Sequence, residues 1–202
     1  MGSTPESLIL ASASTARVAM LRAAGMNFTA IPAAIDEGAI KRQGRSDGQD
    51  AVACAAALAL AKAQSVASRY PQSIVVGADQ ILVAGDEWFD KPADLAAAAV
   101  QLYRLSGRSH VLATAACAVR GGECLWTAQS APKLTMRHIG ENFLAEYIEA
   151  EGKAVLGSVG AYRIEGRGVQ LFSRIEGDYF AILGLPLIEL LAFLRGRGLL
   201  KE

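Results

Sequence analysis

Ser73-Ile74-Val75-Val76-Gly77-Ala78-Asp79-Gln80 is the strongest strand signal in the sequence. The apolar, β-branched run at its start is typical of a buried strand in an α/β sheet. We expect this strand to end in Gly77-Ala78-Asp79-Gln80, which places Asp79 at the strand end, and we expect residues 81–83 to continue extended to a turn at Gly85-Asp86. Because ligands of open α/β sheets collect beyond the carboxyl ends of the strands, the stretch predicts a functional carboxylate at Asp79.

The first residues of the chain predict a second strand followed by a turn and a helix. Leu8-Ile9-Leu10 is a short apolar strand that runs into Ser12-Ala13-Ser14, and the following helix ends at Gly25. Hydroxyl groups, backbone N–H groups and a helix N-terminus together bind anions well. We therefore expect Ser12, Ser14 and Arg17 to bind a phosphate. Alternatively, Ser14 only caps the helix and Arg17 is a solvated surface charge.

Helices and strands alternate along the rest of the chain. We expect an extended piece over residues 28–35, a polar loop over 36–48, an alanine-rich helix to about residue 69, a helix carrying residues 95–102, a long hairpin over 109–136, a helix carrying residues 143–148, a glycine-rich segment over 152–168, a strand over 169–175, a loop or short strand over 177–184 and a last helix carrying residues 187–194. No segment repeats at a fixed period. The pattern predicts an α/β architecture and one domain over residues 1–202.

Composition excludes several classes of protein. The 20 Lys and Arg residues balance the 20 Asp and Glu residues, so the chain lacks the overall positive charge that nucleic-acid binding uses. The apolar run over residues 51–61 is too short to cross a bilayer, which takes about 20 residues. Residues 1–6 lack the basic and apolar regions of a signal peptide, and the cysteine count of 3 is odd. We expect a cytoplasmic protein with reduced thiols, without a membrane or nucleic-acid partner.

Two acidic positions could hold a divalent metal ion. A carboxylate at Asp79 can bind Mg²⁺ or orient a water molecule, and Glu37 beside Asp36 could add a second oxygen ligand. Alternatively, Asp79 caps a turn and the other two residues are loop charges.

Two lysines could neutralise phosphate oxygens. Lys62 lies late in the alanine-rich helix, and Lys91 precedes Pro92, which restricts the backbone before it to an extended form. An isolated lysine is more often a surface charge. His110 and His138 are too few and too far apart for a metal cluster, so we expect them to be structural. The motifs of P-loop, dinucleotide-binding, zincin and α/β-hydrolase proteins do not occur in the sequence.

Taken together, the short motifs resemble those of the Maf family of nucleotide pyrophosphatases over nearly the whole chain. The matching segments occur in one order: residues 8–14 with Arg17, Asp36-Glu37, residues 60–63, 76–80, Lys91-Pro92, 105–108 with His110 and Thr114, 160–162, 175–179 and 184–187. Several motifs in one order are more specific than any single motif. In the first motif, Thr15 and Ala16 stand where the family usually has proline and a bulky residue, which weakens the expectation for base recognition more than that for catalysis.

The resemblance implies a two-lobed fold similar to that of inosine triphosphatases, with a twisted mixed sheet, a nucleotide cleft between the lobes and commonly a homodimer. It implies hydrolysis of a nucleoside triphosphate to the monophosphate and pyrophosphate, and a role in keeping non-standard nucleotides out of nucleic acids. We expect Mg²⁺ or Mn²⁺ at Glu37 and Asp79, Asp79 as the proton acceptor, and Arg17, Lys62 and Lys91 around the triphosphate. Whether Asp79 mainly removes the proton or binds the metal stays open, since both roles need the same carboxylate.

The resemblance also points to the base. Gln80 and Glu165 look like the residues of a branch that acts on 7-methyl-GTP. A carboxylate only accepts hydrogen bonds, so Glu165 could take the paired N–H donors of guanine. An alternative of another class is a protein that binds a nucleotide without hydrolysing it and regulates cell division, since members of this family have been linked to septum formation. Retention of Glu37, Lys62, Asp79 and Lys91 favours the enzyme.

Overall fold

The computed structural model describes residues 7–201. The expectation about a signal peptide concerns residues 1–6 and lies outside the described part. The protein is an α/β protein with an open, mixed sheet of eight strands in the order β2-β1-β3-β5-β7-β8; β4 pairs with β3 and β6 pairs with β5. The predicted α/β class with a mixed sheet is therefore confirmed, while the two lobes and the nucleotide cleft stay predictions. The described chain divides into two compact units, of which the first contains residues 7–79, 114–130 and 178–201, and the second contains residues 80–113 and 131–177.

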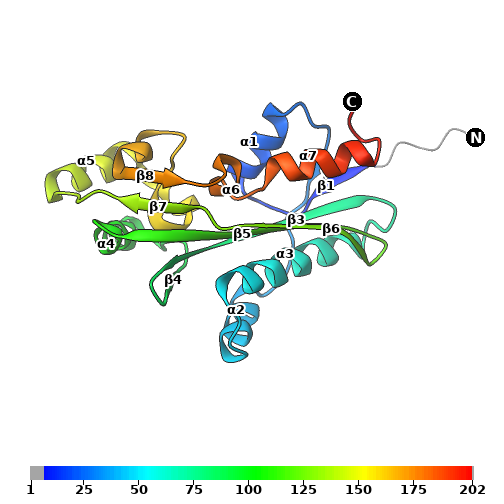
Figure 1. Cartoon of the computed structure of the whole chain (residues 1–202), viewed down its shortest axis with the longest axis horizontal. Coiled ribbons are helices and arrows are strands. Elements are labelled where there is room, and N and C mark those ends of the chain that lie inside the picture. Colours follow the sequence, from blue (N-terminus) through cyan, green and yellow to red (C-terminus); the bar gives the residue numbers. More distant parts are fainter. Residues whose placement is uncertain (1–6, 202) are drawn as a thin grey trace, which may run out of the picture. The chain divides into compact units, whose positions relative to one another are not determined.

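The first unit contains parallel strands joined by helical connections. β1 (Leu8–Leu10) pairs in parallel with β2 (Thr29–Ala30) and with the start of β3 (Ile74–Ala84). β5 (Ser109–Arg120) and β6 (Glu123–Ser130) form the expected hairpin, with Gly121 and Gly122 as its turn. α1 (Thr15–Ala23) and α7 (Leu187–Gly196) lie on one side of these strands and α3 (Ala51–Ala67) lies on the other (Figure 1).

The core of this unit has two apolar layers because successive strand residues point to opposite faces. On one face Leu10 and Val76 pack with Leu21 of α1 and Leu190 of α7. On the other face Val75, together with Ile9 and Cys117, packs against Ala59, Ala63 and Val66 of α3. The small alanine side chains let α3 lie close to the sheet.

Three local predictions were wrong. β3 does not end near Asp79 but runs as one strand to Ala84, so the extended residues 81–83 that were expected belong to the same strand. Antiparallel pairing of Leu82–Ala84 with β4 (Glu87–Phe89) extends it. Asp79 therefore lies in mid-strand and caps no turn. Residues 36–48 contain α2 (Glu37–Ser46) where a loop was expected, and residues 177–184 contain the short α6 (Tyr179–Ile182).

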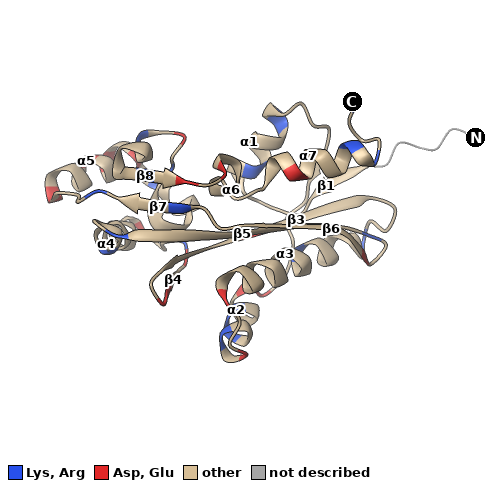
Figure 2. Cartoon of the chain, viewed as in Figure 1, with Lys and Arg blue, Asp and Glu red and all other residues tan. Residues whose placement is uncertain are grey.

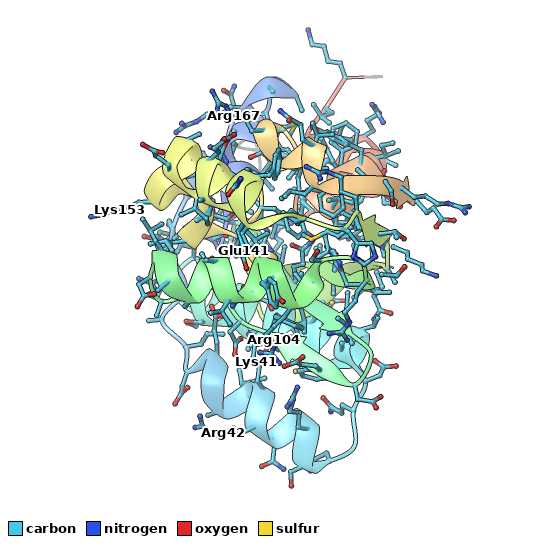
Figure 3. The ribbon with its side chains drawn as sticks, turned by 90° about the vertical axis from the view of Figure 1, so that its left-hand side faces the viewer. Lys41, Arg42, Arg104, Glu141, Lys153 and Arg167 are labelled. Atoms are coloured by element: carbon cyan, nitrogen blue, oxygen red, sulfur yellow. The ribbon has the colours of Figure 1, made fainter. Side chains whose placement is uncertain are left out.

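Both missed helices begin at an aspartate cap. The Asp36 carboxylate accepts a hydrogen bond from the Ala39 amide at 2.8 Å, and the Asp178 carboxylate accepts one from the Ala181 amide at 2.6 Å. α2 carries Glu37 in its first turn and basic residues further along, which suits the helix dipole (Figure 2). Its exposed Arg42 points away from the helix axis (Figure 3). α2 is thus a charged surface helix that hydrophobic periodicity does not detect.

The second unit is built from a small antiparallel sheet and helices. β7 (Lys133–Met136) pairs with the first residues of β5 and with β8 (Phe172–Glu176). The region 109–136, expected as one long hairpin, therefore contains two strands, β6 and β7, that pair with different parts of β5. α4 (Leu95–Leu105) and α5 (Glu141–Glu151) confirm the two predicted helices. The glycine-rich segment forms three 3-10 turns, η1 (Gly152–Gly157), η2 (Val159–Ala161) and η3 (Arg167–Leu171), and β8 begins only at Phe172.

The two histidines of this unit differ in burial, and the structural role expected for the exposed His138 stays a prediction. The ring of His110 is buried and its Nε2 atom lies 2.8 Å from the Tyr162 hydroxyl oxygen. Burial lowers the pKa of His110 to about 4, and the positive charge of Arg108 acts in the same direction. His138 packs over Gly107.

Two further expectations can be compared with the structure. Within residues 7–201, no helix has the length and apolar character needed to span a bilayer. The three cysteines are free thiols, and Cys117 faces Thr127 on β6 while Cys124 faces Val119.

Candidate active site

The candidate site of the first unit is built on the middle of β3, where α3 covers the strand. Gly77 and Asp79 share the face that Val75 contributes to the α3 layer. A β-carbon on Gly77 would lie 2.1 Å from the Ala59 carbonyl oxygen and 3.0 Å from the Ala63 β-carbon. Only glycine lets the helix come this close, and Lys62 of the helix thereby reaches the carboxylate of Asp79.

Lys62 holds two carboxylates together. Its ammonium group donates a hydrogen bond to Asp79 Oδ1 and lies 2.8 Å from Glu37 Oε1. The side chains of Lys62 and Asp79 are only 11% and 8% exposed, whereas that of Glu37 is 50% exposed. A buried charge needs a partner, and here each buried charge has one. The structure therefore contradicts the alternative that Lys62 is a surface charge.

Glu37 reaches this cluster because α2 begins at it. The Asp36 cap directs the first turn of α2, and α2 packs along α3. The cluster thus joins Glu37 of α2, Lys62 of α3 and Asp79 of β3, three elements that follow one another in the sequence.

Arg17 lies in the first turn of α1 and is buried. Its Nε donates to the Gly184 carbonyl oxygen at 2.7 Å and its Nη1 donates to Ser12 Oγ at 3.4 Å. Burial lowers the pKa of Arg17 from its usual value, and the negative charges of Asp79 and Glu37 act in the opposite direction. Arginine remains charged at neutral pH, so a fixed positive charge stands in the field of the two carboxylates. The alternative that Arg17 is a solvated charge is wrong.

The two serines have different surroundings. Ser12 is buried, and its hydroxyl oxygen accepts from the Ser14 amide at 3.1 Å as well as from Arg17. Ser14 is the N-cap of α1 and accepts from the Arg17 amide at 3.4 Å. The capping role of Ser14 is thus observed, while a role in phosphate binding stays a prediction for both residues.

The other predicted residues lie in the second unit. Gln80 is the next residue of β3, and Lys91 is exposed in the segment after β4. Glu165 is exposed between η2 and η3, where its Oε1 accepts from Arg163 Nε at 3.1 Å. Their proposed roles in phosphate and base binding stay predictions.

The donor set of the first unit suits a divalent cation. No three His, Cys, Asp or Glu side chains of the described residues converge into a metal-binding group. However, Mg²⁺ is commonly held by one or two carboxylates, with phosphate and water oxygens as its other ligands. Glu37 and Asp79 contact the same ammonium group, so both come within reach of a single cation.

Sequence reasoning missed the roles of two glycines. Gly77 admits α3 to the strand, and Gly184 supplies the carbonyl group that holds Arg17. Both lie in motifs that were recognised, but their function depends on residues far away in the sequence.

Comparison with known proteins finds a family match and similar sequences over nearly the whole chain. Residues 7–197 match the model of a family described as Maf, Maf-like protein. A nucleoside triphosphate pyrophosphatase of Granulibacter bethesdensis is 52% identical over 188 residues, which cover 93% of this chain and 95% of the relative. One of Paramagnetospirillum magneticum is 48% identical over 190 residues, covering 94% and 98% of the two chains. A 7-methyl-GTP pyrophosphatase of Rhizobium etli is 48% identical over 197 residues, covering 96% and 98%.

Proposed function

The chain belongs to the Maf family, and we propose that it is a hydrolase that converts nucleoside triphosphates to the nucleoside monophosphate and pyrophosphate. One structural observation carries the proposal: the Lys62 ammonium binds both Asp79 and Glu37, beside the buried guanidinium of Arg17. This arrangement offers carboxylates for a proton and a cation, together with positive charge for phosphate.

In the proposed reaction a water oxygen attacks the α-phosphorus and the bond from this phosphorus to the bridging oxygen of the pyrophosphate breaks. Asp79 accepts the proton that the water loses, and pyrophosphate leaves with the electron pair of the broken bond. Lys62 and Arg17 stabilise the negative charge on the phosphoryl oxygens, which is the main task in phosphoryl transfer. We assign Lys91, Ser12 and Ser14 to the same triphosphate.

Glu37 and Asp79 are the residues that would hold Mg²⁺ or Mn²⁺. The ion would supply positive charge to phosphate oxygens that the protein side chains do not neutralise. The support for this assignment is the convergence of two carboxylates on one ammonium group.

Guanine nucleotides, and 7-methyl-GTP in particular, are the proposed preferred substrates. The support is the resemblance of Gln80 and Glu165 to one branch of the family, and relatives named 7-methyl-GTP pyrophosphatase that are 47% and 48% identical. Methylation at N7 makes the base cationic, which strengthens its pairing with a carboxylate. Removal of such nucleotides would keep them out of nucleic acids. We further propose a homodimer in the cytoplasm, where free thiols such as the three found here persist.

The decisive experiment is a pyrophosphate-release assay on a panel of nucleoside triphosphates, with Mg²⁺, with Mn²⁺ and with excess chelator. We expect release from at least one nucleotide and dependence on the cation. Tight nucleotide binding with no release would instead support a regulator that binds without turnover. Full activity in excess chelator would refute the proposed metal site but leave the proposed hydrolase activity intact.

A further inference from the structure

The buried contact between Arg17 and Gly184 joins two segments that are 167 residues apart in the sequence and belong to the same unit. Arg17 is in the first turn of α1, and Gly184 follows α6. The Gly184 carbonyl oxygen accepts the Nε–H of Arg17 at 2.7 Å, the shortest of the hydrogen bonds given above for this guanidinium.

A side chain at position 184 would be strained and would displace Arg17. The φ angle of Gly184 is +97°, a region that residues with a β-carbon rarely adopt. A β-carbon there would lie 3.1 Å from Nη2 and 3.2 Å from Nε of Arg17. A side chain would therefore push on the guanidinium itself and not merely on neighbouring apolar groups.

The carbonyl group of Gly184 is held in place from two directions. The Asp178 cap fixes the start of α6, and the Gly184 amide donates to the Ala181 carbonyl oxygen at 2.9 Å. The buried hydroxyl of Thr114 on β5 donates to the same Ala181 oxygen at 3.0 Å. The turn is thus anchored to the sheet that also carries Asp79.

A guanidinium is a rigid plane, so one strong contact at Nε orients the whole group. With Nε directed to Gly184 and Nη1 to Ser12, the directions of the remaining N–H groups on both Nη atoms are set. Such a fork matches two oxygens of a phosphate. We propose that Gly184 is a positioning residue of the reaction, whose carbonyl group orients the Arg17 guanidinium toward the triphosphate. This inference rests on the proposed function.

The test compares Gly184→Ala with Gly198→Ala. Gly198 also has a positive φ, +72°, but a β-carbon there meets nothing within 4 Å. Both substitutions place a β-carbon on a residue with positive φ, and only the first brings that β-carbon against Arg17. We expect Gly184→Ala to lower kcat/KM for pyrophosphate release at least about tenfold, since small misplacements of a binding group cost this much or more. Gly198→Ala should stay close to wild type.

A double-mutant cycle separates positioning from a general loss of folding. Arg17→Lys keeps the positive charge but lacks the Nε–H and the plane. If Gly184 acts through Arg17, Gly184→Ala should change kcat/KM by less than about threefold in the Arg17→Lys background. Thr114→Val removes the hydrogen bond to the Ala181 carbonyl oxygen, which anchors the turn before Gly184. We expect it to lower kcat/KM less than Gly184→Ala does, and to have no further effect in the Arg17→Lys background. Thermal melting of each variant shows that it is folded.

Two results would overturn the inference. One is a kcat/KM for Gly184→Ala equal to that of the wild type. The other is independence in the double variants: Gly184→Ala or Thr114→Val lowers kcat/KM in the Arg17→Lys background by the same factor as in the wild type. Either result, with an active wild-type enzyme, leaves the proposed function intact. A wild-type protein that releases no pyrophosphate from any nucleotide would instead refute the proposed function.

Discussion

Gly77 of β3 and Ala59 of α3 touch so closely that a β-carbon on Gly77 would lie 2.1 Å from the Ala59 carbonyl oxygen. Lys62 follows Ala59 by about one helical turn, and Asp79 follows Gly77 on the same face of the strand. The contact between the two backbones thus sets the contact between the ammonium and the carboxylate.

Gly77→Ala should therefore separate Lys62 from Asp79. The helix must move to admit the methyl group, and overpacking of this kind costs about 1–3 kcal/mol of the free energy of unfolding. We expect a lower melting temperature and a large loss of pyrophosphate release. Gly196→Ala is the control, because a β-carbon at this position of α7 meets nothing within 4 Å and should leave both quantities nearly unchanged.

Asp79→Asn should abolish most turnover, because the amide does not accept the proton and is a weaker ligand for a cation than a carboxylate. Loss of a general base lowers the rate by about 10² to 10⁴. Lys62 keeps Glu37 as a partner, so we expect the variant to stay folded by circular dichroism. Asp86→Asn, an exposed change, serves as the control. Near wild-type kcat in the Asp79 variant would refute the assignment.

Glu37→Gln should raise the Mg²⁺ concentration needed for half-maximal activity, since an amide oxygen is a weaker ligand than a carboxylate for a hard cation. Glu189→Gln is a matched control, because Glu37 and Glu189 both lie in the first turn of a helix and face the same helix dipole. Equal Mg²⁺ requirements for the two variants would contradict the metal site.

Stability should fall with pH because of His110. The pKa of this buried ring is about 4, below the usual value near 6.5 of an unfolded chain. Between these values the unfolded state binds a proton that the folded state does not, so the free energy of unfolding decreases by roughly 3 kcal/mol as the pH falls through the window. Urea unfolding at pH 7 and pH 5 measures the change. His110→Gln should flatten the dependence, whereas His138→Gln should preserve it.

Glu165→Gln should shift substrate preference away from guanine nucleotides. A glutamine amide presents both a donor and an acceptor, so it no longer matches the paired donors of guanine. The measurement is kcat/KM for 7-methyl-GTP, GTP, dTTP and UTP. Glu176→Gln is the control: Glu176 pairs with Arg174 at 2.9 Å as Glu165 pairs with Arg163 at 3.1 Å, with the same spacing along the chain. A wild-type enzyme that prefers dTTP or UTP would remove the basis of this prediction.

Much of the fold could be predicted because it depends on local patterns. The apolar strand at residues 74–76, the alanine-rich helix and the last helix, which carries residues 187–194, were each assigned correctly. α2 and α6 were missed because each begins at an aspartate cap and lacks a long apolar stripe. The extended course of residues 81–83 was predicted, but their continuity with residues 74–76 in one strand was missed. Hydrogen bonding to β4 keeps extended a segment whose glycine and aspartate disfavour a strand.

The sequence by itself determined the family, through several short motifs in one order, and it selected Glu37, Lys62 and Asp79 as candidates for one site. The folded structure was needed to see that Lys62 is a buried partner of both acids, that Arg17 donates to Gly184, and that a β-carbon at Gly77 or Gly184 would meet a distant segment. The physical reason is that propensity and periodicity act between near neighbours in the chain. Burial and close approach of backbones depend on segments that only folding brings together.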